Sequence, residues 1–320
     1  MKRSPALISV LGLVVALAAC TASSGTLGSV PPLSSADPSV AVGSPDLTPA
    51  PSAPDPSASP SGSGASSPAP SPVGTTIVRA YYFLDGPAGS AGLVPVLREI
   101  PSTKAVATAA VTALLDGPTA RERGGDPAIS TVIPTGTKLL DLTVTDGVAT
   151  VDLSSEFKSG GGSASVLGRL AQVVFTLTQF PTVKSVAFQV EGQAVTAFGG
   201  EGAVLDGPVT RADYKDQLPA IFADRPAWMA GFGNPGRVTG TADVFEAQFR
   251  VTLLDGTGHQ LFDGPVHATC GTGCRGTFDI SVAYKVDKAQ WGTLRLWNPS
   301  AKDGSPEDVR EYPVWLTPAS

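Results

Sequence analysis

Hydrophobic residues are distributed unevenly along the 320-residue chain, and the first group lies at the N-terminus. Residues 6–19 are almost wholly apolar and follow the basic pair Lys2 and Arg3. A run of about fourteen residues is too short for a transmembrane helix, which needs about 20. A basic segment followed by a short apolar run is typical of a secretory signal peptide, so we predict that residues 1–19 form one.

The apolar run ends in the sequence Leu17-Ala18-Ala19-Cys20. Small residues directly before a cysteine resemble the lipobox of bacterial lipoproteins. In that family the chain is cut before the cysteine, whose sulfur then carries a diacylglycerol. The resemblance implies lipidation of Cys20 and anchoring to the outer face of the cell membrane, since two acyl chains suffice for stable anchoring. The alternative is an ordinary signal peptide in which the cysteine is incidental.

Residues 21–75 carry only scattered Val and Leu among Ser, Pro, Ala and Gly. They contain no aromatic residue and no Lys, Arg or Glu, and twelve of the 29 prolines lie between Pro31 and Pro72. Such a segment cannot bury enough apolar surface to offset the entropy lost on ordering. We therefore predict that residues 20–75 form a disordered tether between the anchor and the folded part.

A regular hydrophobic pattern begins at Thr76. Clusters of β-branched and aromatic residues predict strands, and apolar residues three to four positions apart predict helices. The predicted order is a strand at 77–84, a strand at 93–100, a helix at 104–116, a hairpin at 139–154, a helix at 163–180 and a strand at 185–195. In the second helix the apolar stripe consists of Leu167, Leu170, Val174 and Leu177. This order predicts an α+β domain over residues 76–216, with two helices packed on one face of a mixed sheet.

Asp146-Gly147 is a strong signal for a two-residue hairpin turn. Pairing outward from this turn places three apolar pairs on one face of the hairpin: Val144 with Ala149, Leu142 with Val151, and Leu140 with Leu153. The other face then carries Asp141 opposite Asp152. Two opposed carboxylates could hold a cation, but solvated surface is the favoured interpretation.

The pattern changes again near Leu218-Pro219. Residues 217–320 show short strands with turns about every ten residues and no helix of comparable quality, which predicts an all-β sandwich. The clearest alternation predicts a strand over 244–251 that buries Phe245, Ala247, Phe249 and Val251. All four tryptophans lie in this second domain: Trp228, Trp291, Trp297 and Trp315.

Charge excludes one class of function. Without residues 1–19 the chain has 20 Lys and Arg against 28 Asp and Glu, a net charge of −8, and no basic run occurs anywhere in the sequence. Binding to nucleic acid and polybasic attraction to anionic lipid are therefore both disfavoured.

Residues 76 to about 215 resemble the GerMN domain of sporulation and spore-germination lipoproteins. The resemblance is carried, in family order, by the segments 113–118 (ALLDGP), 133–137 (IPTGT), 151–157 (VDLSSEF) and 176–183 (TLTQFPTV). Residues from about 219 to 318 resemble the immunoglobulin-like domain that accompanies GerMN in many bacterial lipoproteins. Its marks are the segments 240–247 (GTADVFEA), 276–278 (GTF) and 303–304 (DG).

The two resemblances imply a membrane-anchored lipoprotein that faces outward and takes part in assembly or in envelope contacts. Related proteins act in sporulation and germination of endospore formers. Neither family brings catalytic residues that could be assigned to this chain. The fold expected from the resemblances is an α+β domain followed by an immunoglobulin-like sandwich.

Two glycine-rich segments could suggest a phosphate site. Residues 231–236 read Gly-Phe-Gly-Asn-Pro-Gly, but the strand-like sequence after them lacks the helix that a dinucleotide site requires. Residues 160–163, Gly-Gly-Gly-Ser, precede a predicted helix and could hold an anion. They lack the lysine of a phosphate loop, so a flexible loop with a helix cap is favoured and no cofactor is predicted.

Cys270 and Cys274 are separated by Gly-Thr-Gly. In the oxidising compartment that the lipobox implies, paired cysteines are usually disulfides. Together with His267 they could instead supply three metal ligands, but a structural zinc site needs four, and free thiols are the third possibility. We predict a disulfide between Cys270 and Cys274 and no metal site.

The pattern favours no enzymatic chemistry. His259 lies beside a predicted turn, and the sequence has no Gly-x-Ser-x-Gly elbow for a serine hydrolase. We therefore expect a non-enzymatic, extracytoplasmic lipoprotein whose domains bind envelope or membrane proteins. Three alternatives stay open: a module that binds cell-wall glycan such as peptidoglycan through its tryptophans, an accessory lipoprotein that regulates a sensor kinase, and, least favoured, a hydrolase.

Overall fold

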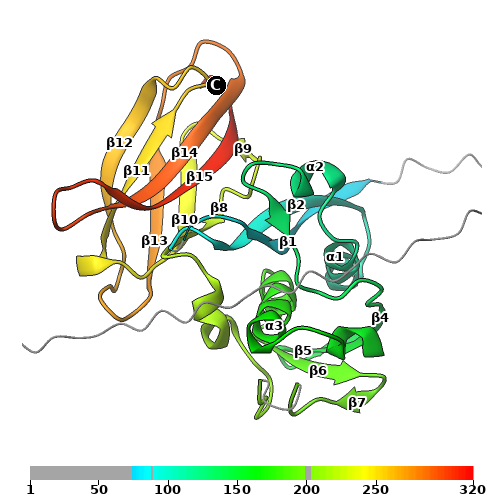
Figure 1. Cartoon of the computed structure of the whole chain (residues 1–320). Helices are drawn as coiled ribbons and strands as arrows, with labels where there is room; N and C mark the ends of the chain where they lie inside the picture. Colours follow the sequence, from blue (N-terminus) through cyan, green and yellow to red (C-terminus); the bar gives the residue numbers. More distant parts are fainter. Residues whose placement is uncertain (1–73, 88, 199–202, 320) are drawn as a thin grey trace, which may run out of the picture. The chain divides into compact units, whose positions relative to one another are not determined.

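The computed structural model describes residues 74–87, 89–198 and 203–319 (Figure 1). The predicted signal peptide, Cys20 and almost all of the predicted tether lie outside the described residues. The part of the chain from residue 67 onward forms one compact unit. None of the helices in the described ranges is long and apolar enough to cross a membrane.

The first half of this unit mixes helices and strands. Its elements are β1 (Thr75–Leu84), β2 (Gly92–Pro101), α1 (Val106–Leu115), α2 (Ala120–Arg123), β3 (Ile129–Ser130), β4 (Leu139–Thr145), β5 (Val148–Leu153), η1 (Ser155–Lys158), α3 (Ser163–Leu177), β6 (Ser185–Val190), β7 (Gln193–Ala194) and η2 (Arg211–Gln217). The strands form an antiparallel sheet in the order β2-β1-β3 and a mixed sheet in the order β4-β5-β6-β7, in which β5 and β6 are parallel. The predicted α+β class is confirmed, although the strands form two sheets where the sequence pattern suggested one.

Helix α3 separates these two sheets, with β1 on one side and β5 and β6 on the other (Figure 1). From Gly168 to Leu177 every residue of the helix is buried, including the polar Gln172 and Thr176. A helix that is buried on all faces belongs to the interior of a domain rather than to its surface. The predicted apolar stripe therefore describes only one of the faces that the helix buries.

The polar residues of α3 complete the hydrogen bonding of β1. The Thr176 hydroxyl accepts a bond from the Tyr81 backbone N–H at 3.2 Å, and the Gln172 side-chain amide donates to the Tyr81 carbonyl at 2.9 Å. Just after the helix, Gln179 accepts from the Arg79 N–H at 2.8 Å and donates to the Arg79 carbonyl at 2.7 Å. These side chains take the place of a neighbouring strand along the open edge of β1, since buried backbone groups need partners.

The β4–β5 hairpin forms with the predicted turn, and the two apolar pairs nearest to that turn are confirmed. The predicted pair of Leu140 with Leu153 is wrong, because a register shift places Leu139 opposite Leu153 and leaves Leu140 exposed. Such a bulge inserts one extra residue into one strand. Asp141 does lie opposite Asp152, as predicted, and Asp152 accepts from the backbone N–H of Gly192 at 3.0 Å.

The predicted strand over 185–195 is divided in two. Strand β6 ends at Val190, and Glu191 and Gly192 both have positive φ angles, 52° and 73°, which reverse the chain into β7. Two consecutive residues with positive φ are typical of the tightest hairpin turns. The alternating sequence pattern continues through this turn and therefore conceals it.

The second half of the unit is all β. Its elements are β8 (Ile221–Arg225), β9 (Gly231–Phe232), β10 (Gly236–Ala242), η3 (Phe245–Ala247), β11 (Gln248–Leu254), β12 (Gln260–His267), β13 (Gly276–Val282), β14 (Gln290–Pro299) and β15 (Pro306–Leu316). They form one sheet in the order β13-β10-β8 and another in the order β12-β11-β14-β15-β9. The rings of Phe249 and Phe278, one from each sheet, lie 4.9 Å apart in the core between them. The predicted sandwich is confirmed.

The strand predicted over 244–251 starts later than expected. Residues 245–247 form a turn in which Glu246 and Ala247 have positive φ angles of 53° and 58°, and the Phe245 side chain is exposed. The prediction that Phe245 is buried is therefore wrong, and Ala247 is only partly buried. Phe249 and Val251 are buried as predicted, because β11 begins after the turn.

The hydrophobic core continues from the first half into the second. The Phe222 ring of β8 lies 5.9 Å from the Phe175 ring of α3 and 6.5 Å from the Tyr81 ring of β1. Gly92, with a φ angle of +140°, lies so close to the chain connecting the halves that a Cβ there would be 2.8 Å from the Pro219 nitrogen. The two halves are thus packed against each other rather than joined by a free linker.

One buried arginine fastens the two halves together. Arg310 of β15 is 2% exposed and donates to the backbone carbonyls of Ser90 at 2.5 Å, Leu93 at 2.7 Å and Gly92 at 3.4 Å. Its Nε also donates to the Tyr312 hydroxyl at 3.0 Å. Three of these four hydrogen bonds go to the β1–β2 turn and the start of β2 in the other half.

We expect Arg310→Ala to lower the free energy of unfolding by at least about 3 kcal/mol, because buried carbonyls left without a donor cost about 1–3 kcal/mol each. Urea denaturation followed by circular dichroism measures this loss. The matched control is Arg295→Ala, which removes an exposed pair with Glu311 and should cost about 1 kcal/mol or less. Equal losses in the two variants would contradict the role given to Arg310.

Candidate binding groove

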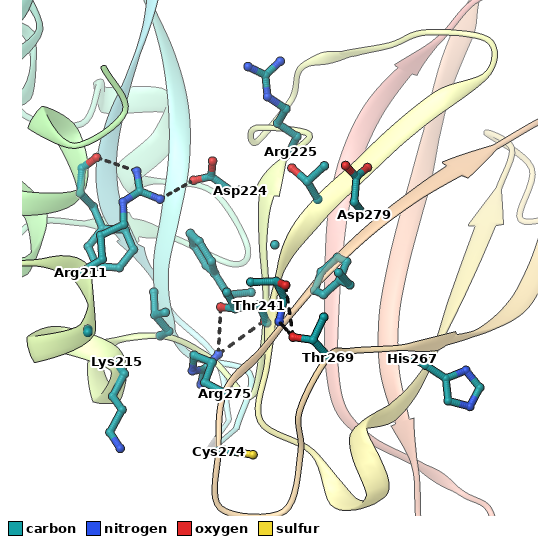
Figure 2. A pocket seen from close by; sticks show the side chains of 18 of the residues that line it. Arg211, Lys215, Asp224, Arg225, Thr241, His267, Thr269, Cys274, Arg275 and Asp279 are labelled. Carbon is teal, nitrogen blue, oxygen red and sulfur yellow. Dashed lines mark hydrogen bonds and ion pairs between the residues drawn. The ribbon is translucent and has the colours of Figure 1, made fainter. Parts of the chain in front are cut away.

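A groove of about 1200 Å³ lies in the described part of the molecule. One wall is η2 together with the end of α3, and the floor and the other wall are β8, β10, β13 and the loop before β13 (Figure 2). Strands β10 and β8 lie so close together here that a Cβ on Gly240 would overlap the carbonyl oxygen of Phe222. The floor of the groove is therefore an outer face of the β13-β10-β8 sheet.

The groove is basic although the chain is acidic. Five Lys and Arg side chains and two Asp side chains contribute to its lining: Arg211, Lys215, Arg225, Arg237, Arg275, Asp224 and Asp279. The remaining polar lining consists mainly of hydroxyl groups from Thr239, Thr241, Thr269 and Thr277. Positive charge gathered in a hollow attracts anionic groups of a ligand or partner.

Asp224 is the central charge at one end of the groove. It accepts a 2.5 Å hydrogen bond from the Tyr81 hydroxyl and a 3.2 Å bond from Arg211, and Arg79 lies 3.6 Å away. Burial, followed by the charge of Asp224, raises the pKa of Tyr81 well above its ordinary value. The phenol therefore stays protonated and acts as a donor to the carboxylate.

Arg211 is held on several sides. Its guanidinium lies 4.6 Å from the centre of the Phe175 ring and donates to the Phe175 carbonyl at 3.1 Å and to the Thr178 hydroxyl at 2.7 Å (Figure 2). Burial alone would lower the pKa of Arg211, but Tyr81 and Asp224 outweigh it and raise the pKa. Arg211 is thus a fixed positive charge that forms part of the wall.

Arg275 connects the groove to the segment between the two halves. It donates to the Pro219 carbonyl at 3.0 Å and, more weakly, to the carbonyls of Ala220 and Thr241 at 3.4 and 3.5 Å (Figure 2). Burial lowers the pKa of its guanidinium. Arg275 follows Cys274 directly, so the conformation of the cysteine loop fixes where this arginine lies.

Two cations at the groove differ from the others. The side chains of Lys215 and Arg225 form no hydrogen bond or ion pair with any described residue, and no dashed line reaches either of them in Figure 2. Arg237, by contrast, is paired with Asp279 through a 2.8 Å bond from its Nε. Lys215 and Arg225 are therefore the charges that an incoming anionic group can reach without breaking an existing contact.

The histidine and cysteine side chains of the groove are His267 and Cys274. No group of three or more His, Cys, Asp or Glu residues in the described ranges is arranged to hold a metal ion. His267 lines the groove, but its side chain points away from the floor in Figure 2. Cys274 also lines the groove, and the structure joins it to Cys270 with the two Cα atoms 5.8 Å apart.

The glycine-rich segments do not build phosphate sites in the structure. Residues 231–236 contain β9 and lead directly into β10, so a strand follows where a dinucleotide site would need a helix. Residues 160–163 do precede α3, but the buried Arg169 fills the space beside them and donates to the Gly160 carbonyl at 2.7 Å.

The basic groove itself was missed at the sequence level. Its cations lie between residues 211 and 275 on η2, β8, β10 and the loop before β13, and no two of them are adjacent in the chain. Only the pairing of β8 and β13 with β10, and the position of η2 beside them, gathers these charges. Cys20 cannot be placed, because it lies outside the described residues.

The fold defines a class of protein: an α+β domain packed onto a sandwich, with a groove where the two meet. Residues 80–196 match the family Germane, described as sporulation and spore germination. Residues 220–305 match Gmad2, the immunoglobulin-like domain of bacterial spore germination. The chain thus consists of a GerMN domain followed by the immunoglobulin-like germination domain, as the sequence resemblance implied.

The chain is also similar, at low sequence identity, to several solved structures. The first GerMN domain of the sporulation protein GerM from Bacillus subtilis is 20% identical, with 43% of this chain and 99% of that one covered and a TM-score of 0.36. The tandem GerMN domains of GerM are 15% identical, with 66% and 62% covered and a TM-score of 0.34. A candidate lipoprotein from Clostridium perfringens is 21% identical, with 45% and 93% covered and a TM-score of 0.31. No curated protein matches the chain.

The pairing of the two cysteines near the groove is open to a direct test. We expect the native protein, treated with an alkylating reagent without reduction, to gain no label on Cys270 or Cys274, because both sulfurs are joined. Mass spectrometry of the digested protein measures the label. After reduction and unfolding, both residues should take it up. Ready labelling of both cysteines in the native protein would show that the disulfide is absent.

Proposed function

We propose that this protein is a lipid-anchored, extracytoplasmic lipoprotein without enzymatic activity that binds another envelope protein through the groove. Lipid on Cys20 holds it at the outer face of the cell membrane. Residues 1–19 are the signal peptide that is removed, and residues 20–75 are a tether. The folded domains at 76–216 and 217–320 form the binding part. Membership in the sporulation and germination families supports a role in the envelope.

The observation that carries the proposal is the pair of unpaired cations at the groove. Lys215 and Arg225 are available to a partner, and the remaining charges of the lining are already held by neighbours. An acidic segment of a partner would gain two new ion pairs without displacing an internal one. Charge complementarity of this kind accelerates and orients association more than it adds affinity.

The partner proposed here is therefore a protein segment rich in Asp and Glu. The threonine hydroxyls of the groove floor can donate to its carboxylates or accept from its backbone N–H groups. An extended segment fits a floor made of sheet, because the outer faces of β10 and β13 are open along the groove. Pairing between exposed surface charges is screened by salt, so binding should weaken as ionic strength rises.

The test is crosslinking in intact membranes followed by capture of the protein and identification of its partners. We expect Lys215→Glu combined with Arg225→Glu to reduce recovery of the principal partner about tenfold, because two attractive charges become repulsive. The matched control is Lys302→Glu, which reverses an exposed lysine in the turn between β14 and β15, outside the groove. Unchanged recovery in the double variant, or no captured protein with the unaltered chain, would overturn the proposal.

The anchor is tested separately with Cys20→Ser. Because serine cannot carry the thioether-linked lipid, we expect this variant to leave the membrane fraction and to retain an uncleaved or differently cleaved signal peptide. Fractionation and intact-mass measurement check both results. The unaltered chain should show the added mass of the lipid. A variant that stays in the membrane as the unaltered chain does would show that Cys20 is not the anchor.

A further inference from the structure

The four tryptophans of the sandwich occupy different environments. Trp228 is buried, and Trp297 is partly buried and donates through Nε1 to the Thr252 hydroxyl at 3.0 Å. Trp291 and Trp315, in contrast, are 44% and 38% exposed. Trp228 therefore belongs to the core, whereas Trp291 and Trp315 lie at the surface. Large exposed aromatic side chains that lie together need an explanation by function.

Trp291 of β14 and Trp315 of β15 form one surface. They are opposite each other in the antiparallel ladder, and their rings lie 5.3 Å apart at an angle of 70°. The Trp315 ring lies against the Trp291 ring, and Trp291 lines a shallow hollow of about 470 Å³ that is separate from the groove. Its rim includes Gly256, Gly258 and Gly292, which have no side chains that could cover the rings.

Met229 completes the apolar part of the hollow. It has a φ angle of +56°, a conformation that costs energy for a bulky residue, and its side chain is 38% exposed. The backbone around it is fixed, since the Trp228 N–H donates to the Pro95 carbonyl at 2.8 Å and the Trp315 N–H donates to the Ala230 carbonyl at 2.9 Å. Strained residues that the surrounding structure holds in place gather at binding sites.

The hollow also has two polar groups of opposite charge. Asp255 and Arg121 both line it, so their charges cancel. The Oδ1 atom of Asp255 accepts from the N–H groups of Thr257 at 2.8 Å and His259 at 3.0 Å, whereas its Oδ2 atom has no partner among the described residues. The Arg121 guanidinium likewise has no hydrogen bond or ion pair within the described part of the chain. One free acceptor and one free donor thus line the same hollow as the Trp291 indole.

We infer that this hollow binds a ring of an uncharged oligosaccharide. The apolar C–H face of a pyranose ring would lie on the exposed indole of Trp291 or Trp315, with Met229 at its side. A sugar hydroxyl would donate to Asp255 Oδ2, and another would accept from Arg121. The site is independent of the groove and of the protein partner proposed for it.

A sugar fits these observations better than an apolar peptide segment does. An apolar segment would cover Asp255 and Arg121 without offering either a partner, and burying unpaired charges is costly. A hydroxyl can donate and accept, so a sugar satisfies both groups. An anionic or cationic polymer would find one attractive and one repulsive charge in the hollow. The balanced rim therefore selects ligands without net charge.

The experiment titrates the full-length protein in detergent with chitohexaose, an uncharged oligosaccharide, and records tryptophan fluorescence. Exposed indoles change their emission when a sugar covers them, so we expect a saturable change. Trp291→Ala and Trp315→Ala should each weaken binding at least about tenfold, which corresponds to about 1.4 kcal/mol. Asp255→Asn tests the acceptor and should weaken binding while leaving the tryptophan signal of the free protein in place.

The matched control is Phe245→Ala, which removes an exposed aromatic side chain outside the hollow and should leave the affinity unchanged. Thermal unfolding of each variant shows whether the fold is retained. Sedimentation with purified peptidoglycan extends the test to a polymer. The inference is overturned if the protein shows no fluorescence change at millimolar chitohexaose. It is also overturned if the tryptophan variants bind chitohexaose as tightly as the unaltered chain does. Retained sugar binding together with loss of a crosslinked protein partner would assign these tryptophans to that partner instead.

Discussion

The hydrogen bonding of β1 along its open edge is the constraint on which the rest of the structure depends. Side chains of α3 and Gln179 bond the backbone of Arg79 and Tyr81, so the helix must lie directly against the strand. The Tyr81 hydroxyl then reaches Asp224 in the sandwich and brings Arg211 to the same carboxylate. One strand therefore determines the position of the central helix, the orientation of the sandwich and one end of the groove.

Sequence patterns predicted the fold class well, because it depends on periods that single segments display. Sequence patterns failed where two different local structures are compatible with the same hydrophobic pattern. Leu139 and Leu140 are equally apolar, so only the bulge in the folded hairpin decides which one lies inward. The apolar stripe of α3 indicated only one buried face, because no local signal shows that Gln172 and Thr176 bond another strand. Phe245 continued an alternating pattern across a turn that depends on tertiary packing.

The candidate sites also differ in whether they depend on neighbouring residues or on the folded structure. Cys20 and the cysteine pair could be proposed from local sequence, since lipidation and short-range pairing depend on neighbouring residues. The groove could not, because its cations come from several elements and form no run. The tryptophan hollow lies between these cases. The sequence shows that all four tryptophans lie in the sandwich. That Trp291 and Trp315 are exposed next to each other depends on the register of β14 with β15.

The ladder between β1 and β2 has a mechanical consequence. It runs unbroken over ten pairs, from Thr75 opposite Pro101 to Leu84 opposite Gly92, and its hydrogen bonds are perpendicular to the strands. The chain enters the folded part at the Thr75 end of this ladder. A pull along the axis of β1 from that end would load all the bonds in shear at once, together with the bonds from α3. The strand that receives such a load is therefore the one that is tied most firmly to its neighbours.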